Sequence, residues 1–357
     1  MATPHTQIVE LGERSYPVVV GSGLLAGNFN LAAYVSGTDC MIVSNETVAP
    51  LYLQVLIANL SGKSVKTVIL ADGEAHKTID SAMLVIDALV AAGANRDTTL
   101  IALGGGVVGD ITGFAAATYM RGVSLIQVAT TLLAQVDSSV GGKTGVNHPG
   151  GKNLIGAFHQ PKLVLIDTET LNTLPDRELR AGLAEAVKHG AIAASDYFLW
   201  MEQNVEALLA KDGDALAQVI IRSCQIKAAV VAEDEREHGA RALLNFGHTF
   251  AHAIENSLGY GEWLHGEAVA AGMVMAAELS ELDEAQQQRL IALLEALGLP
   301  VRPPPVGAAR LRKAMNLDKK IMAKRLRFIL LESIGSAYIA DDVPDALLSR
   351  VLAYGEP

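Results

Sequence analysis

Cysteine is scarce in this chain of 357 residues, which contains only Cys40 and Cys224. Two cysteines far apart in a long chain argue against a disulfide framework and indicate a reducing compartment, so we expect a cytoplasmic protein. No stretch approaches the roughly 18 unbroken apolar residues of a membrane-spanning helix. The first seven residues also lack the basic start and apolar run of a signal peptide. We therefore expect a soluble protein that is not embedded in a membrane.

Positive charge is also in short supply, because 28 lysines and arginines stand against 39 aspartates and glutamates, giving a net charge of −11. Nucleic acids and anionic membrane surfaces bind basic faces, so this balance argues against both as partners. An acidic small molecule would need a local basic pocket. Apolar residues, by contrast, make up 50% of the chain, which is enough for a large interior and, at this length, for two domains.

Short apolar runs alternate with helix-length segments in the first half of the sequence. Residues 7–11 and 16–20 are expected to form two strands around a tight turn. Buried strands are expected at 40–44, 66–70, 98–103, 125–129 and 163–166, each separated from the next by a helix-length segment. Such a succession predicts a parallel sheet in an α/β fold.

The pattern changes near Pro175, after which Ala-rich and Leu-rich helical periodicity dominates to about Leu297. We therefore expect two domains: an α/β domain over residues 1–175 and a mainly α-helical domain over residues 176–357. Neither an internal repeat nor a low-complexity segment is visible.

The segment Gly104–Asp110 follows an expected strand and opens an expected helix. Its glycines at positions 104, 106 and 109 satisfy the pattern G-x-G-x-x-G, in which bare backbone and helix N-terminal amides bind a pyrophosphate. A tight strand-to-helix turn without a ligand explains the same pattern. The acidic ribose anchor of that motif is missing after the strand at 125–129. A dinucleotide would then have its ribose held near Asn45 and Glu46, or by Asp72–Glu74.

A second glycine-rich stretch, Val140–Gly145, contains the Gly-Lys-Thr of a phosphate-binding P-loop. Asp137 occupies the place of the first glycine of that motif, where a carboxylate would repel a phosphate tail. Lys143 fits better as an anion ligand, paired with Lys152 in the loop Gly150–Asn153. Two solvated turn lysines remain the alternative.

Three of the nine histidines, His248, His252 and His265, lie within 18 positions. On a helix His248 and His252 stand one turn apart on one face, and Glu255 continues the stripe. Catalytic zinc sites built from two histidines and one carboxylate keep their fourth position open for water or substrate. A histidine in the core and another on the surface would give the same spacing, so an acidic ligand must still be found.

Acidic residues occur on a helix expected to begin after Pro175. On its helical wheel Glu185 shares a face with Glu178, Lys188 and His189. A solvated polar face with a weak Glu–Lys pair explains this pattern. If the face lines a cleft, it supplies a metal ligand and a cation together.

A series of short segments, in order along nearly the whole chain, resembles the 3-dehydroquinate synthase family of the shikimate pathway. The matching segments are Asp72–Lys77, Gly104–Asp110, Arg121–Gly122, Gln127–Thr131, Gln135–Thr144, Gly151–Asn153, Gly182–Lys188, Glu233–Glu255 and His265–Glu267. The resemblance implies an α/β N-terminal NAD-binding domain with a parallel sheet and a mainly α-helical C-terminal metal-binding domain. It also implies a homodimer.

The resemblance further implies one divalent metal, zinc or cobalt, in the cleft between the two domains. Its ligands would be Glu185, His248 and His265, which replaces the expectation of a helical polar face. His252 would then act on substrate and protons beside the metal rather than as a ligand.

NAD is implied to lie across four segments of the first domain, with Asp137, Lys143 and Lys152 near the nicotinamide end. The cofactor-binding residues expected from the resemblance are Asp72, Gly73, Glu74, Ala75, His76, Lys77, Gly106, Val107, Val108, Gly109, Asp110, Thr130, Thr131, Lys143, Lys152, Thr170, Leu171, Asn172 and Thr173.

Similar enzymes hold the substrate at both of its anionic ends. The implied substrate-binding residues are Lys227 and Arg241 for the carboxylate, Lys152, Asn153, Asn245 and His252 for the phosphate, together with Lys188. In these enzymes Arg121 comes from the other subunit of the dimer, and one of Lys319, Lys320 and Lys324 joins the phosphate site. The expected catalytic residues are His252, Lys143, Lys188 and Asp137.

The family reaction converts 3-deoxy-D-arabino-heptulosonate 7-phosphate to 3-dehydroquinate and phosphate. NAD transiently removes a hydride from C5, phosphate leaves by β-elimination, NADH returns the hydride, and an aldol closure forms the ring. One alternative is a metal- and NAD-dependent polyol dehydrogenase, against which Lys152, Lys227 and Arg241 argue. Another sugar phosphate cyclase would differ in its carboxylate-binding residues. A binding module without catalysis is disfavoured because no motif is broken.

Overall fold

The computed structural model describes residues 4–237, 239–259, 261–321 and 326–355, and for residues 316–321 it describes the backbone alone. The chain divides into two compact units: Met1–Leu174 with Leu216–Arg236, and Pro175–Ala215 with Glu237–Pro357. The first division falls beside Pro175, where the sequence predicts a boundary. The segment Leu216–Arg236, which the sequence assigns to the second domain, groups with the first unit instead.

A seven-stranded sheet in the order β1-β2-β9-β6-β5-β3-β4 forms the centre of the first unit. Its neighbouring strands are all parallel except β1 and β2, which form an antiparallel hairpin. The strands are β1 (His5–Val9), β2 (Tyr16–Gly21), β3 (Asp39–Asn45), β4 (Ser64–Leu70), β5 (Thr99–Gly104), β6 (Ser124–Ala129) and β9 (Leu163–Asp167). Each strand that the sequence predicts is present, with ends displaced by no more than two residues.

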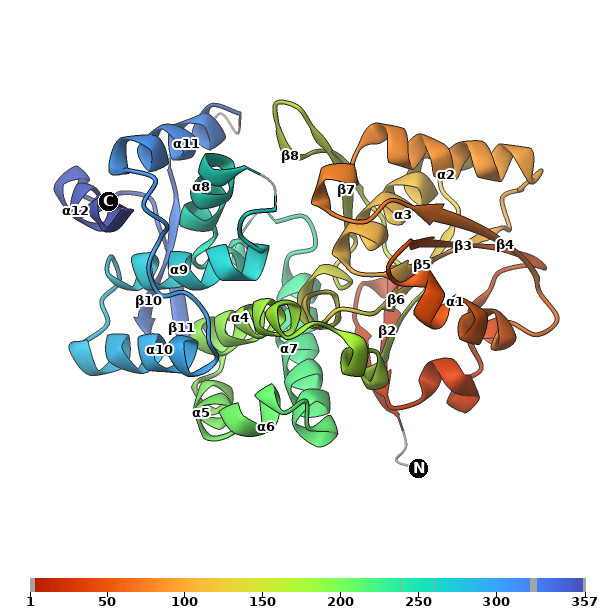
Figure 1. Ribbon diagram of the computed structural model, residues 1–357, viewed down its shortest axis with the longest axis horizontal. Helices are drawn as coiled ribbons and strands as arrows, with labels where there is room; N and C mark the ends of the chain where they lie inside the picture. Colours follow the sequence, from red (N-terminus) through yellow and green to blue (C-terminus); the bar gives the residue numbers. More distant parts are fainter. Residues whose placement is uncertain (1–3, 238, 260, 322–325, 356–357) are drawn as a thin grey trace. The chain divides into compact units, whose positions relative to one another are not determined.

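Helices cover both faces of this sheet (Figure 1). On one face, Leu100 of β5 belongs to a buried cluster with Val85 of α2 (Ile79–Ala91) and Ile111 of α3 (Gly106–Thr118). On the other face, Ile101 of β5 clusters with Leu56 of α1 (Ala49–Ala58). Because successive side chains of β5 point to opposite faces and both faces are covered, the strand is a continuous apolar run.

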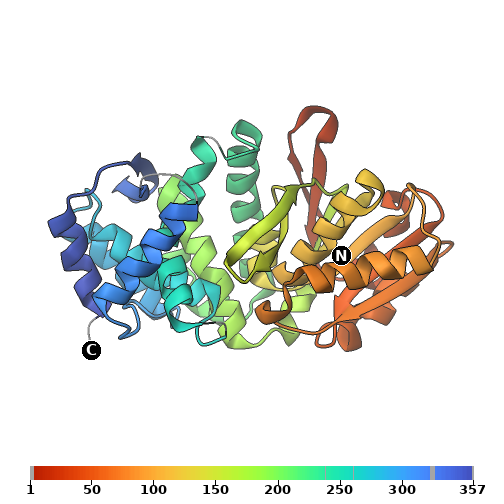
Figure 2. The same ribbon diagram turned by 90° about the horizontal axis from the view of Figure 1, so that it is seen from above.

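Two hairpins extend the first unit. Strands β7 (Lys143–His148) and β8 (Gly151–Phe158) pair in an antiparallel hairpin. The Gly-Lys-Thr segment therefore runs into a strand, whereas a P-loop runs into a helix, which rules out the P-loop interpretation. The β1–β2 hairpin projects beyond the rest of the sheet (Figure 2), and at its tip Arg14 Nη2 donates to Glu235 Oε2 at 2.7 Å.

Helix α7 (Gly213–Glu233) is long and apolar enough to cross a membrane by length and composition, but half of that apolar window is buried inside the fold. Its buried face is anchored in the first unit, where the thiol of Cys224 donates to the carbonyl oxygen of Gln135 and the ammonium group of Lys227 binds Asp137. These contacts identify α7 as a core helix.

Helices dominate the second unit (Figure 1). They are α4 (Asp176–Ala193), α5 (Ser195–Gln203), α6 (Val205–Leu209), α8 (His248–Leu258), α9 (His265–Ala277), α10 (Glu284–Ala296), α11 (Ala308–Ile321) and α12 (Asp345–Leu352). Helix α9 packs against both α8 and α4. A short antiparallel hairpin, β10 (Phe328–Ser333) with β11 (Ser336–Ala340), also belongs to this unit, and the sequence patterns do not predict it.

Candidate metal and cofactor sites

Three helices of the second unit each supply one side chain to a compact cluster. Glu185 lies in the middle of α4, and His248 and His265 are the first residues of α8 and α9. One ligand atom from each lies within 4.8 Å of the others. Glu185 Oε1 is 3.6 Å from Nε2 of His248 and 3.4 Å from Nε2 of His265. Two imidazoles and one carboxylate are donors that zinc and cobalt accept, so the cluster fits a divalent metal.

The two histidines come together because the backbones of α8 and α9 approach each other closely. A Cβ atom on Gly272 of α9 would stand 2.3 Å from the carbonyl oxygen of Gly247, the residue before His248. Gly247 itself has a φ of 81°, a backbone conformation that side chains with a Cβ rarely adopt. Glycine at both positions is therefore needed to start α8 at His248 against α9.

Glu185 and Lys188 form an ion pair in α4 that is closed to solvent, since their side chains are 0% and 1% exposed. This arrangement contradicts the interpretation of this helix face as a solvated polar surface. Charged groups are rarely buried unless they are paired or bind a metal. The burial of Glu185 therefore supports its assignment to a functional cluster.

The cluster has strongly perturbed histidines. Burial lowers the pKa of His248 to about 3, and the opposing charge of Glu185 does not offset it. Burial also disfavours the charged form of His265, but the carboxylates of Glu255 and Glu185 outweigh it and raise the pKa of His265 to about 10. Because a metal binds the neutral imidazole, a divalent metal in this cluster would displace the proton that the two carboxylates favour on His265.

Three further predicted residues lie in the second unit. The ring of His252 is centred 5.7 Å from that of His248 and 6.4 Å from that of His265, so it lies beside the cluster. Arg241 is 1% exposed and belongs to a 3₁₀ helix, Ala240–Asn245, which precedes α8 along the chain. At the end of this helix the amide of Asn245 donates to Glu237 Oε1 at 2.8 Å.

The candidate NAD site lies at the carboxyl edge of the sheet in the first unit. From β3 the chain crosses to β4 on one side, and from β5 it crosses to β6 on the other side. The direction of the crossover therefore reverses between β3 and β5. Ligands of open α/β sheets bind at such a switch point. There the carboxylate of Asp72, which follows β4, accepts hydrogen bonds of 2.6 Å from Asn45 and from Thr47. The structure thus brings together the two segments that the sequence offers as ribose anchors.

A glycine cradle follows β5 at the same edge. Gly105 caps the N-terminus of α3 without a side-chain hydrogen bond, and a Cβ atom on Gly106 would stand 2.9 Å from Ser138 Oγ. The buried hydroxyls of Thr130 and Ser138 make no hydrogen bond within the part of the chain that the structure describes. Bare amides at a helix N-terminus, flanked by hydroxyls that still need partners, fit the pyrophosphate of NAD.

Lys77 is the central cation of this region. Its ammonium group lies 2.5 Å from Asp110 Oδ2 and 2.5 Å from Asn153 Oδ1. Burial raises the pKa of Asp110, and the charge of Lys77 opposes that rise. Lys77, Asp110 and Asn153, which the resemblance assigns to cofactor and substrate, therefore form one hydrogen-bonded group.

Sequence reasoning missed Asn147, which connects the two candidate loops of the first unit. Its backbone amide donates to the carbonyl of Lys77 at 2.7 Å, and its side-chain amide donates to Glu74 Oε1 at 2.8 Å. Its side-chain oxygen accepts from the backbone amide of Asn153 at 2.9 Å, and Asn153 has a φ of 54°. In the sequence, Asn147 is marked only by being a polar residue between two predicted binding loops.

The remaining predicted residues of the first unit lie on separate elements. Lys227 of α7 donates to the carbonyl oxygen of Asp137 at 2.6 Å and forms an ion pair with its carboxylate. Lys143 begins β7 and is exposed, whereas Lys152 lies at the start of β8 and is half-buried. Arg121 is exposed and has a φ of 65°.

The predicted segment Thr170–Thr173 lies in a 3₁₀ helix, Thr168–Thr173, at the carboxyl end of β9. Thr170 Oγ1 is buried and accepts from Gln135 Nε2 at 3.0 Å, while Thr173 Oγ1 lies 2.5 Å from the hydroxyl of Tyr52. Lys324 and the side chains of Lys319 and Lys320 lie outside the described residues.

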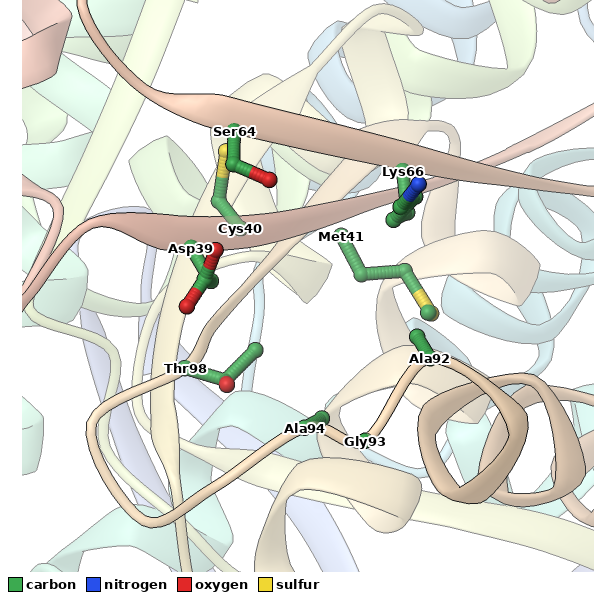
Figure 3. Close-up of a pocket in the computed structure, with 9 residues that line it drawn as sticks. All are labelled: Asp39, Cys40, Met41, Ser64, Lys66, Ala92, Gly93, Ala94 and Thr98. Atoms are coloured by element: carbon green, nitrogen blue, oxygen red, sulfur yellow. The ribbon is translucent and has the colours of Figure 1, made fainter.

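A small pocket of about 80 Å³ opens at the opposite edge of the sheet, among residues at the starts of β3 and β4, the turn Ala92–Ala94 and Thr98 (Figure 3). None of the predicted site residues lines it. Because ligands of open α/β sheets bind at the carboxyl ends of the strands, this pocket at the amino ends is not the candidate cofactor site.

An open, mostly parallel sheet with an anion cradle, joined to a helical unit with a carboxylate–histidine cluster, defines a metal-dependent enzyme with a dinucleotide-binding fold. Residues 67–181 match the family model described as "3-dehydroquinate synthase N-terminal", and residues 182–321 match "3-dehydroquinate synthase C-terminal". The chain belongs to the 3-dehydroquinate synthase family.

Individual relatives agree with this assignment. A 3-dehydroquinate synthase from Hydrogenovibrio crunogenus is 55% identical over 352 residues, which cover 97% of this chain and 98% of the relative. Among solved structures, 2-epi-5-epi-valiolone synthase from Streptomyces hygroscopicus subsp. jinggangensis 5008, with NAD+ and Zn2+ bound, is 33% identical with a TM-score of 0.87 and coverage of 96% and 97%. A 2-deoxy-scyllo-inosose synthase, complexed with carbaglucose-6-phosphate, NAD+ and Co2+, is 27% identical with a TM-score of 0.88 and coverage of 98% and 99%.

Proposed function

We propose that this chain is a 3-dehydroquinate synthase, which converts 3-deoxy-D-arabino-heptulosonate 7-phosphate to 3-dehydroquinate and phosphate. The observation that carries the proposal is the Glu185–His248–His265 cluster, in a chain that matches this family over residues 67–321. The 55% identity to a 3-dehydroquinate synthase, against 33% and 27% to two cyclases of other names, supports this substrate over theirs.

Two cofactors fit the residues described above. Glu185, His248 and His265 would hold one zinc or cobalt ion, and the glycine cradle at the start of α3 would hold the pyrophosphate of NAD. When bound, the metal supplies Lewis acidity toward a substrate hydroxyl, and NAD takes up and later returns a hydride, so neither is consumed.

The side chains proposed to bind the substrate are basic or neutral donors, which explains how an acidic chain can recognise a ligand with two anionic groups. Lys227 and Arg241, both buried, would bind its carboxylate, and Asp137 holds Lys227 in place as a cation. Lys152, Asn153 and Asn245 would bind its phosphate, and Asn153 is oriented for this by Lys77 and by the backbone contact to Asn147.

Proton transfer is the task proposed for the remaining polar residues. His252 lies beside the metal cluster, where an imidazole could exchange protons with a substrate bound there. Lys188 is paired with Glu185, so its positive charge would offset the negative charge of that ligand and of the substrate. Lys143 and Asp137 are proposed to act near the nicotinamide ring.

We also propose a cytoplasmic homodimer in which Arg121 serves the active site of the partner subunit. Mixing Arg121→Ala with Lys152→Ala subunits after reversible dissociation tests this arrangement. A heterodimer would contain one intact site and one doubly defective site, so random mixing should restore about a quarter of wild-type activity. Activity that stays at the level of the separate variants would contradict shared sites.

Two other enzyme functions are compatible with the fold. The solved cyclases favour another sugar phosphate cyclase as the second candidate, because they share the fold at 33% and 27% identity. A polyol dehydrogenase would need neither a carboxylate nor a phosphate site.

Phosphate release from three substrates separates these functions. The metal- and NAD-loaded protein would be given 3-deoxy-D-arabino-heptulosonate 7-phosphate, a heptulose 7-phosphate without the carboxylate, and glucose 6-phosphate. Turnover of the first substrate alone is expected, because Lys227 and Arg241 would lack a partner in the other two. Preference for either of the others would assign the chain to another cyclase.

A further inference from the structure

Both histidines of the candidate metal cluster have Nε2 near Glu185 and Nδ1 near a second oxygen atom. His248 Nδ1 lies 3.2 Å from the carbonyl oxygen of Phe246, and a carbonyl can only accept, so Nδ1 carries the proton. His265 Nδ1 lies 3.3 Å from Glu255 Oε1. In each ring Nε2 is then the atom that faces Glu185.

Glu255 is a buried carboxylate, so its charge requires a compensating partner. It lies on α8, two turns after His248 and on the same face, and it is 7% exposed. A buried carboxylate is unfavourable unless a cation or donor compensates its charge. Its Oε1 atom lies 3.3 Å from the Nδ1 atom of His265, on a different helix.

We propose that Glu255 is a positioning residue for the metal centre, a role that rests on the proposed function of the Glu185–His248–His265 cluster. By accepting the Nδ1 proton of His265, Glu255 fixes the ring orientation and the tautomer whose Nε2 lone pair is directed at the metal. This hydrogen bond also makes Nε2 a stronger electron-pair donor to the metal. Metal-bound histidines commonly donate their second nitrogen to a carboxylate or a backbone carbonyl, and here Glu255 and Phe246 divide these two roles.

Metal affinity is the property that this role should change. Wild-type protein, Glu255→Ala, Glu255→Gln and His265→Ala would each be titrated with Zn2+ against a competing chelator. Substitutions of such supporting groups weaken metal binding roughly 10- to 100-fold. We expect a loss in that range for Glu255→Ala and a smaller loss for Glu255→Gln, whose amide oxygen still accepts the Nδ1 proton. His265→Ala, which removes a ligand, should lose more.

A second readout separates positioning from a general effect on folding. The visible spectrum of Co2+ bound to the protein should change in position or intensity for Glu255→Ala, because the field of the His265 ligand changes. Glu295→Gln removes an exposed carboxylate, and Ser257→Ala removes a buried hydroxyl from the same helix as Glu255. Both should keep wild-type affinity and spectrum.

The outcomes are distinct. Wild-type affinity and spectrum in Glu255→Ala would overturn the positioning role, and so would a loss as large as that of His265→Ala, which would make Glu255 a ligand. If the wild-type protein itself bound no metal, the proposed metal centre would be wrong. Melting of the metal-free proteins confirms that each variant is folded during the titration.

Discussion

Gly266 lies so close to Ala181 that a Cβ atom on Gly266 would stand 2.0 Å from the Ala181 carbonyl oxygen. Gly266 follows the candidate ligand His265 at the start of α9, and Ala181 lies one turn before the candidate ligand Glu185 in α4. The contact of these two backbones therefore sets the separation between the carboxylate and the second histidine of the cluster.

Replacing Gly266 with alanine is expected to damage the cluster through the backbone alone. Because the obstacle is a backbone carbonyl, α9 must shift, and we expect a loss of about 3 kcal/mol in the free energy of unfolding together with weaker zinc binding. Urea unfolding of the metal-free protein and chelator titration measure the two effects. Gly213→Ala is the matched control, since no atom lies within 4 Å of its added methyl group. Equal stability of the two variants would contradict the close approach.

His265→Ala is expected to abolish zinc binding and turnover while the protein remains folded. The loss should exceed the roughly 10- to 100-fold change that supporting residues cause, because a ligand itself is removed. Metal content after dialysis, measured by elemental analysis, and a thermal melt test this prediction. Full activity of this variant in the presence of a chelator would remove His265 from the ligand set.

Lys152→Ala should chiefly impair substrate binding and the chemical step. Lys152 stands at the start of β8, beside Asn153, and its removal takes one positive charge from the proposed phosphate site. Steady-state kinetics should show a higher KM for the heptulosonate phosphate and a lower kcat, with unchanged melting. Unchanged kinetics would place Lys152 outside the site.

Lys77→Met should destabilise the protein in a manner that depends on pH. Burial raises the pKa of Asp110 and Lys77 opposes the rise, so the substitution raises that pKa further. When a carboxyl group has a higher pKa in the folded protein than in the unfolded protein, the protein loses stability as the pH rises from the unfolded-state pKa to the folded-state pKa. We expect a deficit of about 3 kcal/mol at pH about 8 and a smaller deficit at pH about 5.

The double variant Lys77→Met with Asp110→Asn provides the control for this charge effect. It has no carboxylate to bury, so its deficit relative to wild type should be nearly the same at both values of pH. Urea titrations of the three proteins give these free energies. A deficit of Lys77→Met that is independent of pH would show that Asp110 does not respond to Lys77.

Both thiols should be unreactive in the folded protein. Burial raises the pKa of Cys40 to about 11 and that of Cys224 to about 12, and only the thiolate reacts with disulfide reagents. At pH about 8 we expect slow labelling that becomes rapid in denaturant. Cys40, which lines the small pocket, should react before Cys224, as Cys40→Ser and Cys224→Ser variants can show (Figure 3). Rapid labelling of both thiols in the native protein would contradict their burial.

The parallel sheet was predictable because its strands are short apolar runs with clear boundaries, and the glycine cradle was predictable from its place between a strand and a helix. The burial of Glu185 was not predictable from the sequence. Helix α4 packs against α9, α5, α10 and the β10–β11 hairpin, so it is covered on several sides and hydrophobic periodicity carries little information. The resemblance to a known family, rather than the hydrophobic pattern, implied Glu185 as a candidate metal ligand.

Pairings between distant residues were also beyond the sequence patterns. Lys77 and Asp110 meet because β4 and β5 lie on either side of β3, an order that local sequence does not reveal. Glu255 was visible as part of the helical stripe that contains His248 and His252. Its partner, His265, lies at the start of another helix, and only the packing of α8 against α9 brings the two together.

The most direct test of the proposed function follows phosphate and NADH in one reaction. Metal-loaded protein with a catalytic amount of NAD would be given 3-deoxy-D-arabino-heptulosonate 7-phosphate, while phosphate release and NADH absorbance are recorded together. We predict many turnovers of phosphate per NAD without accumulation of NADH, because the hydride returns to the substrate in each cycle. No phosphate release, with NADH accumulating on simple polyols, would show that the chain is a dehydrogenase with this fold.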